Sequence, residues 1–530
     1  MNACAMWNRY KTHLVDHPKI GLRVDVSRMK FGDGFFDEMT APVVHAFDAM
    51  DTLENGAIAN PDENRQVGHY WLRNSALAPT KTIADDIERT IDRVVSFVSG
   101  VHAGQIRPPA ADTFTNILHI GIGGSALGPQ LANAALGGVS DKMRIHFFDN
   151  TDPDGIHRVL SAIGDEGLKR TLVLVVSKSG GTKETRNGML EAQAAFQHAG
   201  LSFPAQAVAI TREGSALSKI ASEQVWIEQF PMWDWVGGRT SQTSVVGLLP
   251  AALQGIDIGS ILLGARDCDE VTRIRDARRN PAMLLALMWV YARSTGIVKD
   301  MVVLPYKDRL ELFSRYLQQL IMESVGKGRN LSGNVIQQGI TVYGNKGSTD
   351  QHAYVQQLRD GLNNFFVTFI DAVHDADAEP VFVEEGVTTG DYLLGFMLGT
   401  RQAIYDNDRE SITITIDRVS PYSLGVLIAL YERAVGFYAS LVGINAYHQP
   451  GVEAGKVVAG DVIALQKQVV EHLRHERQPR SVDEIVVALG VHNHAESILK
   501  ILEHLSANSG RGIRKHPGTT PFDARYEVIG

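Results

Sequence analysis

The chain has 530 residues, enough for about three domains, and 44% of them are hydrophobic, as in globular proteins with a large core. Its 51 basic and 60 acidic side chains give a net charge of −9, which argues against a dedicated nucleic-acid-binding protein. With only Cys4 and Cys268, we expect no disulfide framework and a cytoplasmic location. Charges among the first residues argue against a signal peptide, and the most apolar segment, Pro281–Ala292, is too short to cross a membrane.

The first 110 residues give few strand signals and predict a helical region. Within it, apolar residues recur at helical spacing in Thr82–Val98, which predicts an amphipathic helix packed on a larger domain. From about residue 114, short apolar strands alternate with helices, a pattern typical of a parallel, doubly wound α/β sheet. The expected strands are Ile117–Ile120, Arg144–Asp149, Thr171–Ser177 and Ala205–Thr211.

A second run of strands and helices predicts another α/β domain of the same architecture. Its expected strands are Met301–Pro305, Ile340–Tyr343, Phe365–Asp371 and Ile412–Ile416. Its expected helices are Lys307–Val325, one from about Thr349, Tyr422–Leu441 and one from about Pro450. We therefore expect four parts, which are a helical region at 1–110, two α/β domains at 111–275 and 276–475, and a small unit at 476–530.

The last part of the chain predicts two short helices. Ser481 with Glu484, and Asn493 with Glu496, form capping-box patterns at their starts. A basic stretch, Gly510–His516, follows them. This is the outline of a helix-turn-helix fold, but on an acidic chain we interpret it as a packing appendage.

The turn after the first strand of the first α/β domain is rich in glycine. Gly121–Ala126 reads G-x-G-x-x-A, opens a helix, and is followed by Asp149 at the end of the next strand. This is the outline of a dinucleotide-binding fingerprint, so an NAD-linked oxidoreductase is an alternative. The chain has no G-x-x-x-x-G-K-[ST] run, which argues against a P-loop kinase.

The turn after the third strand discriminates between these functions. Ser177–Glu184 (SKSGGTKE) places three hydroxyl side chains and two glycines where a helix begins, and such a turn attracts phosphate. If the first and third strands are neighbours, Gly124 and Ser125 lie at the same edge of the sheet. Two turns around one anion suit a monophosphate better than a pyrophosphate. The candidate phosphate-binding residues are Gly124, Ser125, Ser177, Lys178, Ser179 and Thr182.

Four further segments carry groups suited to proton transfer. Arg239 follows two glycines and can lean into a cleft, while Gln319 and Glu323 share one partly apolar helix face, a setting that suits a general base. His352 opens a helix after a glycine-rich turn, and Lys456 lies near the start of the last long helix. Taken singly, Arg239 is equally well explained as a surface arginine, and Glu323, His352 and Lys456 are better explained as structural or solvated side chains. Their combination therefore carries the argument.

The combined motifs resemble the phosphoglucose isomerase family almost along the whole chain, from Gly68–Arg73 to Lys456. They occur in the family's order, and the sequences of the segments GGRTS, GNKGSTDQHAY and NAYHQPGVEAGK are most similar to the plastid and cyanobacterial branch. The motifs are GIGGSALGP, SKSGGTKET, DWVGGRTS, QQLIMES, QHAY and HQPGVEAGK.

The resemblance implies two sugar-isomerase (SIS) type domains and a homodimer whose active site uses both subunits. It implies reversible isomerisation of glucose 6-phosphate and fructose 6-phosphate through an enediolate, without a metal or cofactor. By position, Glu323 matches the base, Arg239 the group that stabilises the enediolate, and Lys456 and the other subunit's His352 the ring-opening groups. Substrate contacts match Ser125, Ser177, Ser179, Thr182, Gln319 and Gln449, with Lys178 among them.

One alternative from another class remains. Some sugar-phosphate-binding regulators combine one SIS domain with a helix-turn-helix unit, and the C-terminal part of this chain fits that description. The presence of two α/β domains with both Glu323 and His352 argues against a regulator.

Overall fold

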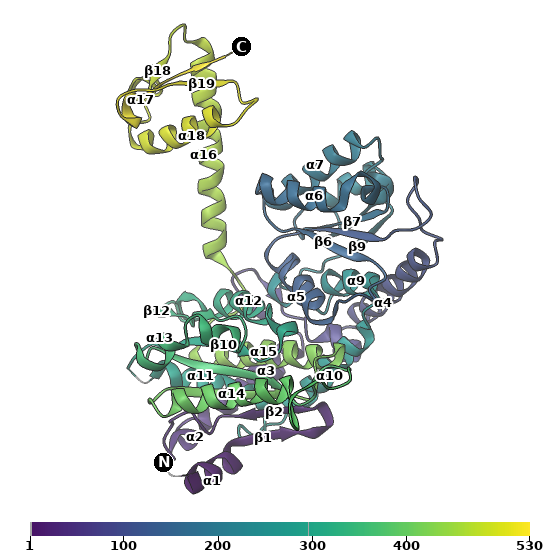
Figure 1. The fold of residues 1–530 in the computed structure, drawn as a ribbon, viewed down its shortest axis with the longest axis vertical. Coiled ribbons are helices and arrows are strands. Elements are labelled where there is room, and N and C mark those ends of the chain that lie inside the picture. The colour runs from purple at the N-terminus through teal and green to yellow at the C-terminus, as the bar shows by residue number, and fades with distance from the viewer. Residues whose placement is uncertain (1–2, 295, 530) are drawn as a thin grey trace. The chain divides into compact units, whose positions relative to one another are not determined.

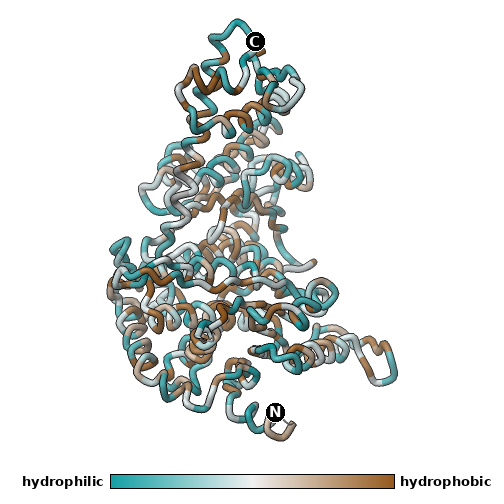
Figure 2. The backbone as a smooth tube through the Cα atoms, turned by 90° about the vertical axis from the view of Figure 1, so that its left-hand side faces the viewer, coloured by the Kyte–Doolittle hydropathy of each residue, from teal (hydrophilic) through white to brown (hydrophobic). Residues whose placement is uncertain are grey.

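The computed structural model describes residues 3–294 and 296–529, and its chain forms two compact units, Met1–His448 and Gln449–Gly530 (Figure 1). The first unit contains two large sheets, each covered by helices on both faces. Hydrophobic residues concentrate in the strands and inner helices, while most surface loops are hydrophilic (Figure 2). The predicted α/β class is confirmed.

The first sheet is parallel and doubly wound. Its strand order is β6-β5-β7-β8-β9, with helices α6, α7 and α8 on one face and α4 and α9 on the other. All four predicted strands and the predicted amphipathic helix are present, and β9 is an additional edge strand. The strands are β5 (Asn116–Ile120), β6 (Arg144–Phe148), β7 (Thr171–Val176), β8 (Ala207–Thr211) and β9 (Glu228–Pro231). The helices are α4 (Lys81–His102), α5 (Leu127–Leu136), α6 (Pro153–Leu168), α7 (Lys183–His198), α8 (Ala216–Glu223) and α9 (Val245–Gln254).

The second sheet has the order β1-β2-β17-β14-β10-β13 and is only partly parallel. Its four central and edge strands β10, β13, β14 and β17 are parallel, as predicted, but β2 pairs antiparallel with β17. The strands are β1 (Leu14–His17), β2 (Leu22–Asp25), β10 (Asp300–Pro305), β13 (Val342–Tyr343), β14 (Phe365–Ala372) and β17 (Glu410–Ile416). The larger helices around it are α10 (Ile258–Thr272), α11 (Pro281–Ser294), α14 (Thr389–Tyr405) and α15 (Pro421–Val442).

The N-terminal region, which was expected to be helical with few strand signals, also contains four short strands among its described residues. Each strand is too short for its alternation of buried and exposed residues to stand out, and β2 is stabilised by pairing with a strand almost 400 residues away. The region contains α1 (Ala3–His13), α2 (Phe35–Glu38), α3 (Thr40–Glu54) and the hairpin β3 (Ile58–Asn60) and β4 (Arg65–Gln66).

The predicted long helix Lys307–Val325 is broken in the structure. It consists of a 3-10 turn η7 (Asp308–Leu310), a short α12 (Phe313–Leu317) and a π-helical turn η8 (Gln318–Glu323). Hydrophobic periodicity does not reveal this π turn, because only residues 324 and 325 continue the helix after it and show the shift in phase. The expected helix after Thr349 is likewise a 3-10 turn η9 (Thr349–His352) followed by α13 (Val355–Asp360).

Helix α15 is the one helix in residues 3–294 and 296–529 that is long and apolar enough to cross a membrane by length and composition. In this fold 83% of its apolar window is buried inside the protein. It therefore serves as a core helix of the first unit, packed against α10, α11 and the second sheet.

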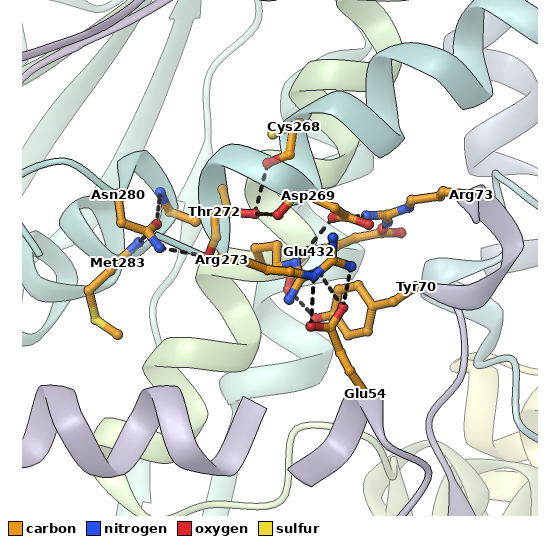
Figure 3. Close-up of polar contacts among 12 residues, drawn as sticks. Glu54, Tyr70, Arg73, Cys268, Asp269, Thr272, Arg273, Asn280, Met283 and Glu432 are labelled. Atoms are coloured by element: carbon orange, nitrogen blue, oxygen red, sulfur yellow. Dashed lines mark hydrogen bonds and ion pairs between the residues drawn. The ribbon is translucent and has the colours of Figure 1, made fainter. Parts of the chain in front are cut away.

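A cluster of buried ion pairs joins α3, η2 (Trp71–Arg73), the end of α10 and α15 (Figure 3). Arg73 Nη1 and Arg433 Nε both donate to Asp269 Oδ1, at 2.7 and 3.1 Å. Arg433 also pairs with Glu54. Three arginines and three carboxylates balance the charge. The six residues are Glu54, Arg73, Asp269, Arg273, Glu432 and Arg433.

The second unit contains three helices and a small antiparallel sheet of order β18-β20-β19 around its own apolar core. Helix α16 belongs to this unit because Leu465, Val469 and Leu473 pack in that core, whereas the sequence analysis ended the preceding domain at 475. Its elements are α16 (Pro450–His475), β18 (Arg480–Ser481), α17 (Val482–Leu489), α18 (Ala495–Ala507), β19 (Ile513–His516) and β20 (Arg525–Val528).

Two predictions about this unit have different outcomes. The capping box of Ser481 and Glu484 is present, with both reciprocal hydrogen bonds. The one at Asn493 is wrong, because the chain makes a 3-10 turn first and α18 begins at Ala495. In the basic stretch, Arg514 and His516 lie 3.2 and 3.0 Å from Glu527, so this pairing partly neutralises the charge that a nucleic-acid surface would need.

Candidate active site

The glycine turn after β5 packs directly on the turn that carries Arg239. A Cβ atom on Gly124 would lie 2.2 Å from the carbonyl of Gly238, so only glycine permits this approach. Ser241 Oγ donates to Gly124 O at 3.1 Å and fixes the contact. A Cβ on Gly123 would lie 3.2 Å from Nε2 of Gln319. Ser125 completes the turn, η4 (Gly123–Ser125). The predicted phosphate turn, Arg239 and Gln319 are therefore brought together.

The hydroxyl-rich turn after β7 lies at the same sheet edge, because β5 and β7 are parallel neighbours with Ile120 opposite Val175. Ser177 Oγ accepts from Gly180 N at 3.1 Å and donates to Thr182 Oγ1 at 3.3 Å. Thr182 is the N-cap residue of α7, but its hydroxyl makes no capping bond. The turn thus presents hydroxyl groups in front of a helix N-terminus, where a phosphate is favoured.

Two other residues complete this turn. Ser179 Oγ accepts from Gly181 N at 3.1 Å. Lys178 Nζ donates to the carbonyl oxygens of Asp234 and Val236 at 2.9 and 3.0 Å, which ties the turn to the loop leading to Arg239. Burial, followed by repulsion from Arg65, lowers the pKa of Lys178 to about 8. Direct contact of Lys178 with a phosphate stays a prediction.

Arg239 and Glu323 form the centre of the site. Arg239 Nη2 lies 3.5 Å from Glu323 Oε1, and its Nη1 donates to Ser324 Oγ and Ala446 O at 3.3 and 3.2 Å. Arg239 is 6% exposed, and burial lowers its pKa against the opposing attraction of Glu323. Glu323 ends the π turn, a type of distortion frequent at functional sites. The pair combines a carboxylate base with a cation for developing negative charge.

His352 lies on an exposed turn that is held in shape by Asp350. Buried Asp350 accepts hydrogen bonds from the backbone N of Asn345 and Lys346, at 2.8 and 3.1 Å, and from the Tyr354 hydroxyl. The turn is thus defined while the His352 ring faces solvent in the single chain. Its participation in catalysis stays a prediction.

Gln449 and Lys456 belong to the second unit. Gln449 is the N-cap residue of α16, and Lys456 lies in its second turn. The side chain of Lys456 lies outside the described part of the structure. The roles assigned to both residues stay predictions.

The sequence analysis missed Lys327, a buried lysine four residues after Glu323. Its ammonium group donates hydrogen bonds to the backbone carbonyl groups of Glu323 and His448. A lysine after glycine at the end of a helix is an ordinary sequence feature, so spacing gave no signal that it would be buried.

Two cavities of the first unit differ in size and in the residues that line them. The larger, of about 1360 Å³, lies between α1, β2 and α14 and holds none of the predicted site residues. A smaller one, of about 310 Å³, is lined by Gly123, Asp149, Arg315 and Gln319. Of the predicted site residues, Gln319 lines the smaller cavity. In it, Asp149 already accepts from Gln130 at 2.7 Å, which weakens the dinucleotide alternative.

Known proteins resemble the chain closely. The family model described as phosphoglucose isomerase matches residues 39–393 and 396–483. A glucose-6-phosphate isomerase of Geobacter sulfurreducens is 60% identical over 513 residues, 97% of each chain, and that of Nostoc punctiforme is 55% identical over the same length and shares. The crystal structure of a glucose-6-phosphate isomerase from Chlamydia trachomatis has a TM-score of 0.79 at 27% identity and covers 87% of this chain and 91% of that one.

Proposed function

The chain belongs to the phosphoglucose isomerase family, and from this premise we propose that the residues around Arg239 and Glu323 carry out its reaction. That reaction is the reversible isomerisation of glucose 6-phosphate and fructose 6-phosphate, a step of glycolysis and gluconeogenesis. The observation that carries the residue assignment is the Glu323 carboxylate, which lies 3.5 Å from the buried Arg239 guanidinium. Formation of glucose 6-phosphate from fructose 6-phosphate by the purified protein tests it.

In the proposed mechanism, the substrate phosphate binds the hydroxyls of Ser125, Ser177, Ser179 and Thr182. His352 and Lys456 transfer protons to and from the ring oxygen and the C1 hydroxyl, which opens the ring. Glu323 then removes the proton from C2 of the aldose and returns it to C1 of the enediolate, while the proton of the C2 hydroxyl passes to O1, so that the ketose forms and the carboxylate is regenerated. Arg239 stabilises the negative charge of the enediolate oxygens. Because Arg239 supplies the positive charge that the enediolate needs, we propose that no metal or cofactor takes part.

The hydroxyl of Thr182 offers a test of the phosphate site. We expect Thr182→Val, which keeps the side-chain shape, to raise the KM for fructose 6-phosphate about tenfold, because a hydrogen bond to a charged oxygen is lost. kcat should change little. Steady-state kinetics on the variant measure both values.

Thr80→Val is the matched control. Thr80 caps α4 by accepting a hydrogen bond from Ile83 N. Its loss should cost about 1 kcal/mol of stability and leave KM unchanged. An unchanged KM in Thr182→Val would remove this residue from the phosphate site.

We also propose that the enzyme is a homodimer in which each site takes His352 from the partner chain. His352 is exposed in the single chain, and Gln351 beside it donates to Phe396 O in α14 at 3.4 Å. Helix α14 also carries four large apolar side chains that are about two-fifths exposed, as expected for a surface that another copy covers. They are Tyr392, Leu394, Phe396 and Leu398.

Mixed dimers test the shared site. Glu323→Gln and His352→Ala chains, each inactive alone, are coexpressed with different tags and the mixed dimer is isolated. If sites are shared, one of its two sites has both wild-type residues, so we expect about half of the wild-type activity. An inactive mixed dimer would contradict sharing, and failure to isolate any mixed dimer would contradict the homodimer.

The expected location is the cytoplasm. The free thiols of Cys4 and Cys268 fit a reducing compartment. The relatives reported above are bacterial and cyanobacterial enzymes.

A further inference from the structure

Lys327 connects the catalytic base to the chain on the other side of the site. It begins strand β11 (Lys327–Arg329) and is only 6% exposed. Its Nζ donates to Glu323 O at 2.8 Å and to His448 O at 2.9 Å. A buried ammonium group is tolerated only when it is hydrogen-bonded, so these two carbonyl groups account for its position.

The segment 445–448 is held through three consecutive carbonyl groups. Ala446 O accepts from Arg239 at 3.2 Å, Tyr447 O accepts from Asn60 Nδ2 at 3.3 Å, and His448 O accepts from Lys327. Arg239 and Lys327 therefore bind the same short segment, two residues apart. The segment 445–448 therefore helps to position Arg239 directly, and it helps to position Glu323 through Lys327.

The segment itself is fixed from outside the site. Asn445 Nδ2 donates to Asn60 Oδ1 at 2.9 Å and to Asp62 Oδ2 at 2.5 Å, and Asn445 Oδ1 accepts from Tyr447 N at 2.9 Å. Asn60 ends strand β3 and Asp62 lies in the β3–β4 turn. A movement of Lys327 would thus displace Glu323 relative to a fixed frame.

We propose that Lys327 is a positioning residue that anchors the backbone of Glu323 to the 445–448 segment and so sets the distance between the Glu323 carboxylate and Arg239. The inference rests on the proposed function. Lys327 acts through Glu323 and makes no contact with substrate in this role. Misplacement of a base by about 1 Å costs roughly 100-fold in rate, and this sets the size of the expected effect.

The electrostatic surroundings keep Lys327 suited to this role near neutral pH. Burial, followed by repulsion from Arg239, lowers its pKa to about 8, while Glu323 and Asp62 attract the charged form. At pH 7 the ammonium form prevails, and its charge strengthens both hydrogen bonds to the carbonyl groups.

The test compares Lys327→Met with Lys327→Arg. Met keeps the volume but removes the donors, so we expect kcat to fall about 100-fold and KM to stay within about threefold. Arg retains charged donors, so the kcat of Lys327→Arg should be at least tenfold higher than that of Lys327→Met. If Lys327 were needed only for folding, its substitution would lower the amount of active enzyme. The Arg variant would then not recover kcat relative to the Met variant. Lys81→Met, at a lysine whose side chain is 86% exposed, should match the wild type.

Each outcome decides the proposal. A kcat within threefold of wild type in Lys327→Met at pH 7 would overturn it, and so would an equal loss in folded Met and Arg variants. If Lys327→Met does not fold, Lys327→Arg decides the question, because its kcat must exceed one-tenth of the wild-type value. An inactive wild-type protein would instead overturn the proposed function, and the positioning role with it.

Discussion

Glu323→Gln is expected to abolish nearly all isomerase activity while sugar-phosphate binding remains. The amide has the shape of the carboxylate but cannot accept the C2 proton, and general-base catalysis contributes up to about 10⁴-fold in rate. We therefore expect kcat to fall by about 10³- to 10⁴-fold. The phosphate turns at Ser177 and Ser125 are untouched, so the dissociation constant for fructose 6-phosphate should change by only a few-fold.

Calorimetry on the variant gives the dissociation constant, and the coupled assay gives kcat. Glu166→Gln is the matched control, because Glu166 is exposed on α6, where it pairs with Lys169. It should behave as the wild type. A Glu323→Gln variant with turnover within tenfold of wild type would refute the assignment of the base.

Arg433→Met is expected to cause the largest loss of stability. Arg433 is fully buried and bonds to Asp269 and Glu54. Its removal leaves these carboxylates short of positive charge in the core, which costs about 3–5 kcal/mol. The same change should leave the site geometry intact in the protein that remains folded, since Arg239 and Glu323 are not part of the cluster.

The pH dependence of the free energy of unfolding provides a second test of the buried ion-pair cluster. Burial alone would raise the pKa of Glu54, but Arg433 and Arg273 outweigh it and lower the pKa from 4.5 to about 2. Because the folded-state pKa is the lower one, the stabilisation is present above pH 4.5 and is lost as the pH falls towards 2. Arg433→Met should make the free energy of unfolding fall less between pH 4.5 and pH 2 than it does in the wild type.

Urea unfolding followed by tryptophan fluorescence measures both effects. Arg275→Met is the control, because Arg275 pairs with Asp48 and Asp51 on the surface, where its side chain is 44% exposed. Such an exposed pair contributes little to the free energy of unfolding, because solvent and salt screen it. Equal destabilisation by the two substitutions would contradict the structural role given to the buried cluster.

The sequence predicted the parts of the fold and site that are encoded locally. An apolar run such as Thr171–Val176 followed by glycine and hydroxyl residues identifies a buried strand and its turn without any long-range information. The convergence of this turn with Gly124 required only that β5 and β7 be neighbours, and they are.

The remaining features depend on contacts between distant segments. Strand β2 exists because β17 lies beside it, and the π turn at Gln318–Glu323 leaves no trace in hydrophobic spacing. Lys327 is buried because the carbonyl groups of Glu323 and His448 meet at one point. No spacing rule relates residues more than 100 positions apart, so sequence alone could not identify a buried lysine there.

The most direct measurement is a coupled assay of the wild-type protein beside Glu323→Gln. Each protein is mixed with fructose 6-phosphate, glucose-6-phosphate dehydrogenase and NADP in the presence of EDTA. We predict NADPH formation in proportion to wild-type protein, and almost none with Glu323→Gln. No NADPH from the folded wild type, an equal rate with both proteins, or activity lost to EDTA and restored by zinc or manganese would contradict this account.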